Sequence, residues 1–191
     1  MVLMSSIKLS IDDQKICLQT AKDSIKFGLE NNKALSVNSD EYSTDLQQQL
    51  ACFVTLHLNG ELRGCIGALE AYQPLIDDVS EHAFAAAFRD PRFPALQKKE
   101  FELIEIEISV LSQPEQMQFK NQQDLLNQIR PDIDGLILEH GYNRGTFLPS
   151  VWEQLPDKND FLNHLKMKAG LPVGWWDDKA KISRYETFLF K

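Results

Sequence analysis

The sequence contains little cysteine. Cys17, Cys52 and Cys65 are the three cysteines in 191 residues. They are odd in number and show none of the close spacings that a disulfide framework or a zinc ribbon requires. We therefore expect free thiols in a reducing compartment, which favours a cytoplasmic protein.

Long apolar runs and an excess of positive charge are missing as well. The chain has no run of about eighteen consecutive apolar residues, so we expect no membrane span, and its first residues predict no signal peptide. The chain contains 20 Lys and Arg and 28 Asp and Glu, which gives a net charge of -8. Such a surface repels polyphosphates, so nucleic-acid binding is disfavoured.

Several common catalytic and binding motifs are absent. The chain has no Walker-type loop, no G-x-G-x-x-G and no G-x-S-x-G. No H-x-x-H or H-E-x-x-H frame surrounds its histidines, which are His57, His82, His140 and His164. We therefore expect no intrinsic metal and no cofactor.

The apolar periodicity predicts helices interleaved with hairpins. Helices are expected at 11–30, 74–88, 122–129 and 161–169, and strands at 51–58, 61–69, 101–111, 136–139, 146–148 and 182–190. A capping box at Ser10 and Asp13 starts the first helix, and Asn59-Gly60 favours a type I′ turn in the first hairpin. Between 101 and 111, Glu105 and Glu107 alternate with isoleucines, which is typical of a half-buried strand. The stretch 32–49 is polar and is expected to be a surface loop.

This order of elements favours an α+β fold, with a mainly antiparallel sheet and helices packed on it. The block ββ-α-β occurs twice, at about 51–111 and 135–190, which indicates an old duplication. We expect one domain over 1–191, with two lobes at about 10–112 and 113–191.

The best candidate site is the segment Leu62 to Gly67. Gly64 and Gly67 interrupt a strand, and such glycines often mark a bulge or the close approach of a ligand or another backbone. Arg63 supplies fixed donors for a carboxylate or phosphate, and a nearby cation would increase the thiolate fraction of Cys65. The structural alternative is that the glycines relieve packing against a helix, that Cys65 is a core residue and that Arg63 is solvated.

The strand register separates these side chains by face. A two-residue turn pairs Val54 with Cys65, which places Cys65 on the face of Cys52 and Arg63 and opposite to His57. A dyad of Cys65 and His57 would require a bulge at Gly64. We expect Arg63 to serve anion recognition more than stability, so that Arg63→Ala changes the free energy of unfolding by less than about 1.5 kcal/mol.

Two further arginines lie in turns and are candidate ligand-binding residues. Arg92 follows a helix within Asp90-Pro91-Arg92-Phe93-Pro94, and Arg144 lies in the turn Tyr142-Asn143-Arg144-Gly145. The structural alternatives are an arginine that satisfies helix-end carbonyls and an ordinary hairpin tip. Of the three tryptophans, Trp152, Trp175 and Trp176, at least one should belong to the core.

The hexapeptide Leu62-Arg63-Gly64-Cys65-Ile66-Gly67, following Cys52-Phe53-Val54-Thr55, resembles the signature of the AMMECR1 domain family. Further blocks resemble the family in the expected order: Asp90 to Pro94, Glu105 to Leu111, Asp134 to Leu136, Gly145 to Pro149, and Phe161 to Pro172. The resemblance implies an α+β fold with one mainly antiparallel sheet and a duplicated β-α unit. Bacterial members are called protein A of the AmmeMemoRadiSam system, after neighbours that resemble Memo proteins and radical SAM enzymes.

Three functions remain open, and the resemblance supplies no catalytic residue. The first is a module that binds a Memo-like or radical SAM protein, or its substrate, with Arg63, Gly64, Gly67, Arg92 and Arg144 as ligand-binding residues. The second is an enzyme in which Cys65 is the nucleophile and Arg63 holds an anionic substrate. Nucleic-acid binding comes third because of the negative net charge.

Overall fold

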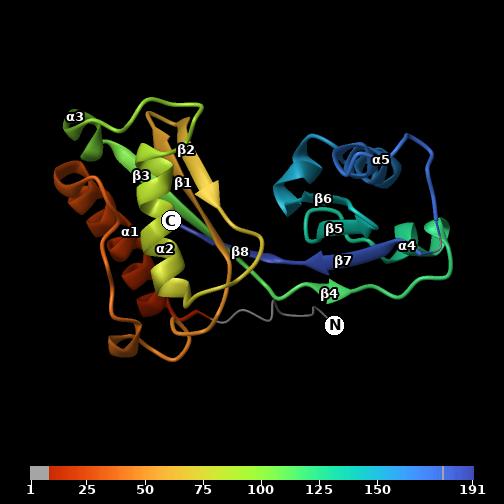
Figure 1. Ribbon diagram of the computed structural model, residues 1–191, viewed down its shortest axis with the longest axis horizontal. Helices are drawn as coiled ribbons and strands as arrows, with labels where there is room; N and C mark the ends of the chain where they lie inside the picture. The colour runs from red at the N-terminus through yellow and green to blue at the C-terminus, as the bar shows by residue number, and fades with distance from the viewer. Residues whose placement is uncertain (1–8, 178) are drawn as a thin grey trace. The chain divides into compact units, whose positions relative to one another are not determined.

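The computed structural model describes residues 9–177 and 179–191 of the chain (Figure 1). The chain divides into two compact units. The first runs to Ser112 and also includes Phe188–Lys191, and the second is Gln113–Thr187. The final residues, expected in the second lobe, thus belong to the first unit. Among the described residues, no helix has the length and apolar character needed to cross a membrane.

The fold class is α+β, as expected, but the strands form two four-stranded sheets and not one. In the first unit the elements are α1 (Ile11–Asn31), η1 (Ser39–Glu41), β1 (Cys52–Leu58), β2 (Glu61–Gly67), α2 (Leu75–Phe88), α3 (Lys98–Phe101), β3 (Ile104–Leu111) and β8 (Thr187–Phe190). The strand order in this sheet is β2-β1-β3-β8. In the second unit they are β4 (Glu115–Gln116), α4 (Gln122–Gln128), β5 (Gly135–His140), β6 (Asn143–Phe147), η2 (Pro149–Glu153), α5 (Lys158–Lys168) and β7 (Lys181–Tyr185). Their sheet order is β4-β7-β5-β6.

Helices α1 and α2 lie side by side and cover one face of the first sheet (Figure 1). The capping box of α1 is present, because Asp13 N–H donates to Ser10 Oγ at 3.0 Å and the Asp13 carboxylate accepts from Ser10. The sheet face below the helices is apolar, with Val54, Leu56 and Ile108 fully buried in the core and Ile104 and Ile106 partly buried against it. This burial supplies the main stabilisation of the unit.

The opposite face of the sheet is partly exposed, and we call it the outer face. Its residues are Phe53, Thr55, His57, Cys65, Glu105, Glu107 and Ser109, which face away from the helices. The alternation predicted for β3 is therefore confirmed, with its glutamates on the outer face. An antiparallel sheet covered by helices on one side commonly exposes the other side in this way.

The duplicated ββ-α-β unit is visible in the strand orders. The three strands of each unit's block are arranged alike, as β2-β1-β3 and as β6-β5-β7. In both, a glycine of the second hairpin strand lies under the following helix. A Cβ at Gly64 would lie 2.1 Å from the Ala86 carbonyl oxygen of α2, and one at Gly145 would lie 2.8 Å from the Ala169 nitrogen at the end of α5.

Some boundaries differ from those predicted. The strand expected at 182–190 is two strands, β7 and β8, which belong to different sheets. The loop expected at 32–49 is anchored, because Leu46 is fully buried and Ser43 Oγ donates to Asp13 Oδ1 at 2.6 Å. Trp152 is buried in the core of the second unit, and Trp176 packs against that core, so the expectation of at least one core tryptophan is confirmed.

Candidate functional site

A β-bulge in the first hairpin changes the register that the sequence predicted. His57 pairs with Leu62, but Leu56 pairs with Gly64, so Arg63 is an additional residue on β2. Cys65 consequently pairs with Thr55, and the predicted pair of Val54 with Cys65 is wrong. A bulge places two residues opposite one, which moves all following side chains of that strand to the other face.

The bulge brings Cys65 to the outer face, together with His57 and away from Cys52. A polar row crosses three strands there, because Thr55 pairs with Cys65 on one side and with Glu107 on the other. The Thr55 hydroxyl donates to Cys65 Sγ at 3.3 Å. Cys65 is a half-buried free thiol. No hydrogen bond joins it to His57 in the part of the chain that the structure describes.

Arg63 lies inside the protein and binds an acidic residue of the chain itself. Its side chain is 9% exposed. Its Nε donates to Glu100 Oε1 at 2.9 Å, and its Nη2 donates to Glu100 Oε2 at 3.2 Å and to the Pro94 carbonyl at 2.9 Å. These hydrogen bonds from Arg63 lower the pKa of Glu100. Arg63 is therefore not the solvated residue of the structural alternative, and the fork that we assigned to an external anion holds Glu100.

One nitrogen of Arg63 keeps an unused hydrogen-bonding capacity. Nη1 is buried and has no hydrogen-bond partner among the described residues. Phe93 lies beside the guanidinium, with its ring centroid 6.0 Å away. The Arg63 side chain thus connects β2 to α3 and to the loop 90–94 through ionic, polar and aromatic contacts.

The loop 90–94 holds the backbone of Cys65 from the side. The Cys65 N–H donates to Asp90 Oδ2 at 2.9 Å, and Arg92 Nη2 donates to the Cys65 carbonyl at 3.3 Å. Because β2 is an edge strand, these side chains occupy backbone groups that another strand could otherwise bind. The predicted helix-end role of Arg92 is replaced by this contact with β2.

Asp90 and Arg92 also form a bidentate ion pair. Arg92 Nε lies 3.0 Å from Asp90 Oδ1, and Arg92 Nη2 lies 2.7 Å from Asp90 Oδ2. Hydrogen bonding to Arg92 holds the pKa of the buried Asp90 far below its usual range. The Arg92 side chain remains 55% exposed. It is thus an arginine beside Cys65 that can contact a ligand from solution.

The two glycines of the segment permit close packing. The space beside Gly64 is filled by the Ala86 carbonyl of α2, and a Cβ at Gly67 would lie 2.4 Å from the Cys52 carbonyl oxygen. The structural alternative of packing against a helix therefore describes Gly64, whereas Gly67 packs against the neighbouring strand β1. Direct contact of a ligand with the Gly64 backbone on the α2 side is excluded by the helix.

Arg144 is part of the second unit and lies in β6, not in the turn predicted for it. Its Nε lies 3.4 Å from Glu139 Oε1, on an exposed part of the β5–β6 hairpin.

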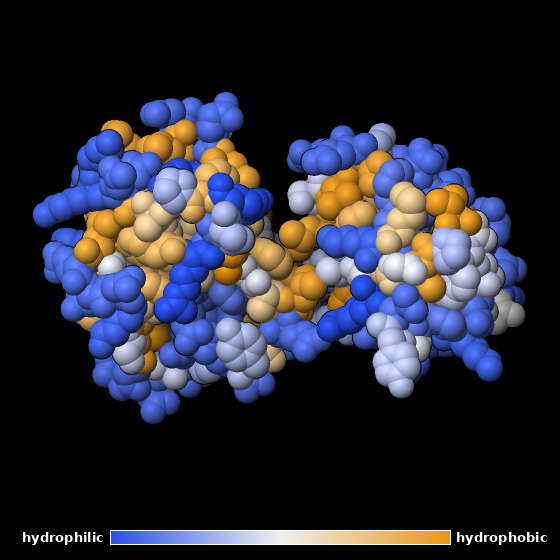
Figure 2. All heavy atoms as spheres, turned by 45° about the horizontal axis from the view of Figure 1, so that its top comes forward, coloured by the Kyte–Doolittle hydropathy of each residue, from blue (hydrophilic) through white to orange (hydrophobic). Residues whose placement is uncertain are grey.

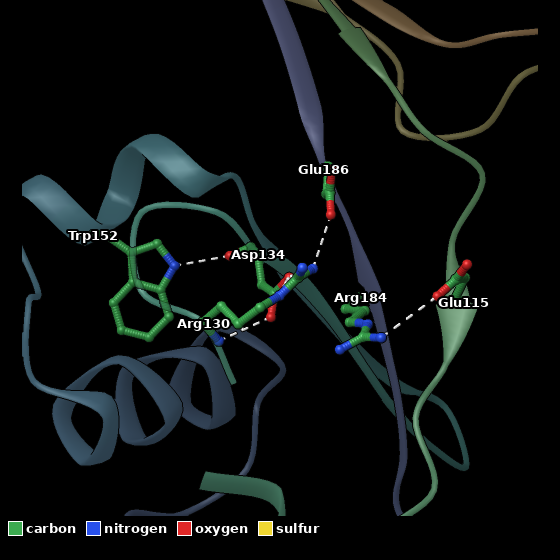
Figure 3. Close-up of polar contacts among 6 residues, drawn as sticks. All are labelled: Glu115, Arg130, Asp134, Trp152, Arg184 and Glu186. Carbon is green, nitrogen blue, oxygen red and sulfur yellow. Dashed lines mark hydrogen bonds and ion pairs between the residues drawn. The ribbon is translucent and has the colours of Figure 1, made fainter. Parts of the chain in front are cut away.

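The second unit contains a cluster of ion pairs around Arg130. Figure 3 shows Arg130 between Asp134 and Glu186, with Nη2 at 2.9 Å from Glu186 Oε1. Asp134 is fully buried, and its carbonyl accepts from Trp152 Nε1 at 2.8 Å. Hydrogen bonding to Asp134 raises the pKa of Arg130. Like Arg63, this arginine is bound to carboxylates of its own chain.

Sequence reasoning missed the acidic partners of the candidate arginines. Asp90 was visible within its motif, and an acidic residue two positions from Arg92 was a usable signal. Glu100 lies 37 positions from Arg63 and carried no local signal. Cys65 was placed on the wrong face because the bulge was not predicted.

Comparisons with known proteins agree with this architecture. The family model described as AMMECR1 matches residues 18–190. A protein of Methanothermobacter thermautotrophicus is 37% identical over 189 residues, which cover 98% of each chain. A protein of Methanocaldococcus jannaschii is 39% identical over 156 residues, covering 80% of this chain and 78% of that protein. A crystal structure of an uncharacterised protein from Pyrococcus horikoshii has a TM-score of 0.79 at 30% identity, covering 92% of this chain and 89% of that one. The chain therefore belongs to the AMMECR1 family.

Proposed function

We propose that the chain is a binding module that recognises a protein partner through the surface around Cys65. This recognition surface consists of Leu62, Cys65, Arg92 and the outer-face residues Thr55 and Glu107. The observation that carries the proposal is the way in which Cys65 is presented. Its backbone is fixed by Asp90 and Arg92, while its thiol is half-buried on the outer face.

The composition of this surface supports a protein partner. Leu62 is 41% exposed, and the side chain of Arg92 is 55% exposed. Figure 2 shows that hydrophobic residues appear at the surface of both units, between hydrophilic ones. Arginine is enriched among the residues that contribute most to protein interfaces, and the core of an interface is apolar. The resemblance makes a Memo-like protein the partner that we propose, and a radical SAM protein the next to test.

Binding of a Memo-like protein to matched variants tests this proposal. Leu62→Asp should weaken binding by at least about tenfold, since it places a charge where an apolar contact forms. Leu103→Asp is the matched control, because Leu103 is also exposed in the first unit but lies outside the recognition surface. Isothermal titration calorimetry measures both. Equal affinities of the two variants would contradict the proposal, as would the absence of binding by the wild type to either partner.

The second candidate is an enzyme with Cys65 as the nucleophile. The observation in its favour is the bulge, which places His57 on the same face as Cys65. A catalytic thiol should react with iodoacetamide with a pH midpoint well below the usual value of about 8.5. A midpoint at or above that value, measured between pH 5 and 9, would remove the nucleophile and with it this candidate.

A further inference from the structure

The first unit contains a buried group of three possible metal ligands that no motif in the sequence announces. It consists of Cys52 at the start of β1 and of Asp78 and His82 on α2, and we call it the β1–α2 cluster. Its ligand atoms all lie within 4.8 Å of one another. We propose that the β1–α2 cluster binds a divalent metal ion of the Zn²⁺ type, which fixes β1 to α2. The proposal does not depend on the proposed function.

The distances between the ligand atoms suit a tetrahedral ion. Cys52 Sγ lies 3.8 Å from His82 Nδ1, and His82 Nδ1 lies 3.2 Å from Asp78 Oδ2. Zn²⁺ binds sulfur at about 2.3 Å and nitrogen or oxygen at about 2.0–2.1 Å, so tetrahedral ligands lie roughly 3.3–3.6 Å apart. One ion can therefore reach all three atoms with small side-chain adjustments. A thiolate, an imidazole and a carboxylate together favour Zn²⁺ over Mg²⁺ or Ca²⁺, which prefer oxygen ligands.

Burial and charge also favour a cation at this position. The side chain of Asp78 is 1% exposed, and Cys52 is fully buried. A buried carboxylate is costly unless it is paired with a positive charge or binds a metal. The ion-pair partner of Asp78 among the described residues is His82, which carries a charge only when it is protonated. A divalent ion would provide the missing charge without requiring a proton on the imidazole.

The carboxylate is already held in a fixed orientation. The Cys52 N–H donates to Asp78 Oδ2 at 2.9 Å, and Gln73 Nε2 donates to Asp78 Oδ1 at 3.2 Å. Hydrogen bonds of this kind orient ligands around a metal. Gln73 Nε2 also donates to the exposed Glu81 at 3.1 Å, so this side chain connects the buried Asp78 to a residue at the surface. Three protein ligands leave one coordination position for a water molecule or an amide oxygen.

Cobalt binding tests the proposal, because Co²⁺ replaces Zn²⁺ and a thiolate ligand gives a charge-transfer band. The protein for this test is the untagged chain carrying Cys17→Ala and Cys65→Ala, in which Cys52 is the remaining thiol. After treatment with a chelator, it should bind about one Co²⁺ per chain with a thiolate band, and Zn²⁺ should displace the cobalt and raise the melting temperature. A folded protein without this band would overturn the proposal.

Variants of the ligands identify the site. Cys52→Ala should abolish the thiolate band, and His82→Gln should reduce the affinity for Zn²⁺ by at least about tenfold. Lys15→Gln, an exposed change on α1, is the control and should leave both unchanged. Circular dichroism establishes that each variant is folded. If both ligand variants fold and bind Zn²⁺ as tightly as the wild type, the three side chains serve only one another and the proposal is wrong.

Discussion

Replacing Arg63 with alanine removes the guanidinium that holds Glu100 to β2. Loss of one partner from a well-buried ion pair costs about 3–5 kcal/mol. Both side chains keep some exposure, which allows water to reach the carboxylate after the change. We therefore expect Arg63→Ala to reduce the free energy of unfolding by about 2–4 kcal/mol. This exceeds the limit of about 1.5 kcal/mol that we expected from the sequence, where Arg63 was assigned to anion recognition.

Conservative and double variants separate the ion pair from other effects. Arg63→Lys keeps the charge but cannot reproduce the fork to Glu100 and Pro94, so we expect a loss of about 1–2 kcal/mol. The double variant with Arg63→Ala and Glu100→Ala should lose less free energy of unfolding than the two single variants lose together. The difference should be about 1 kcal/mol or more. Arg144→Ala is the matched control, because its pair with Glu139 is exposed on both sides. It should change stability by less than about 1 kcal/mol.

Urea unfolding followed by circular dichroism is the assay, because all three tryptophans lie in the second unit and their fluorescence reports on that unit. The effect should depend on pH. Since Arg63 lowers the pKa of Glu100 in the folded protein, the stabilisation is complete above the unfolded value of about 4.3 and is lost as the pH falls through the lower folded value. If the stability losses of the two single variants simply add, or if Arg63→Ala is within about 0.5 kcal/mol of the wild type, the Arg63–Glu100 ion pair does not stabilise the protein.

Three further predictions concern the surroundings of Cys65. Gly64→Ala should destabilise the protein by about 2 kcal/mol or more in urea unfolding, because the added Cβ would meet a backbone oxygen of α2. An unchanged unfolding midpoint would show that the helix does not lie so close to this strand. Asp90→Asn should reduce the free energy of unfolding by about 1–2 kcal/mol at pH 7. The difference in stability between this variant and the wild type should become smaller as the pH falls below about 4, since the stabilisation from a lowered carboxyl pKa is lost on acidification. In the folded protein, Cys65 should react with iodoacetamide before Cys17 and Cys52, since burial raises the pKa of Cys17 to about 12 and Cys52 is fully buried, and mass spectrometry of peptides shows the order.

Local patterns predicted the elements of the fold well. The capping box at Ser10, the Asn59-Gly60 turn and the alternation of Glu105 and Glu107 with isoleucines are all formed by neighbours in the chain. The repeated ββ-α-β order also predicted the α+β class. The number of sheets was not predictable in this way, because β4 and β8 each join a sheet through pairing between distant segments.

The candidate site depended on features that local patterns did not define. The glycines at positions 64 and 67 allowed a bulge, but the regular hairpin fitted the same residues, and the additional residue Arg63 changes the face of Cys65. Glu100 meets Arg63 through the tertiary fold, and the β1–α2 cluster joins residues 26 to 30 positions apart. Sequence reasoning therefore assigned Arg63 to an external anion, whereas the structure pairs it with Glu100.

Protection of Cys65 by a partner would show whether the surface around this thiol is a recognition surface. The measurement is the iodoacetamide reaction rate of Cys65 in the folded protein, with and without a saturating Memo-like protein. We expect the partner to slow the reaction of Cys65 by at least about tenfold, and we expect Leu62→Asp to restore the rate while Leu103→Asp does not. A partner that binds and leaves the rate of Cys65 unchanged would contradict the proposal that the surface around Cys65 is the recognition surface.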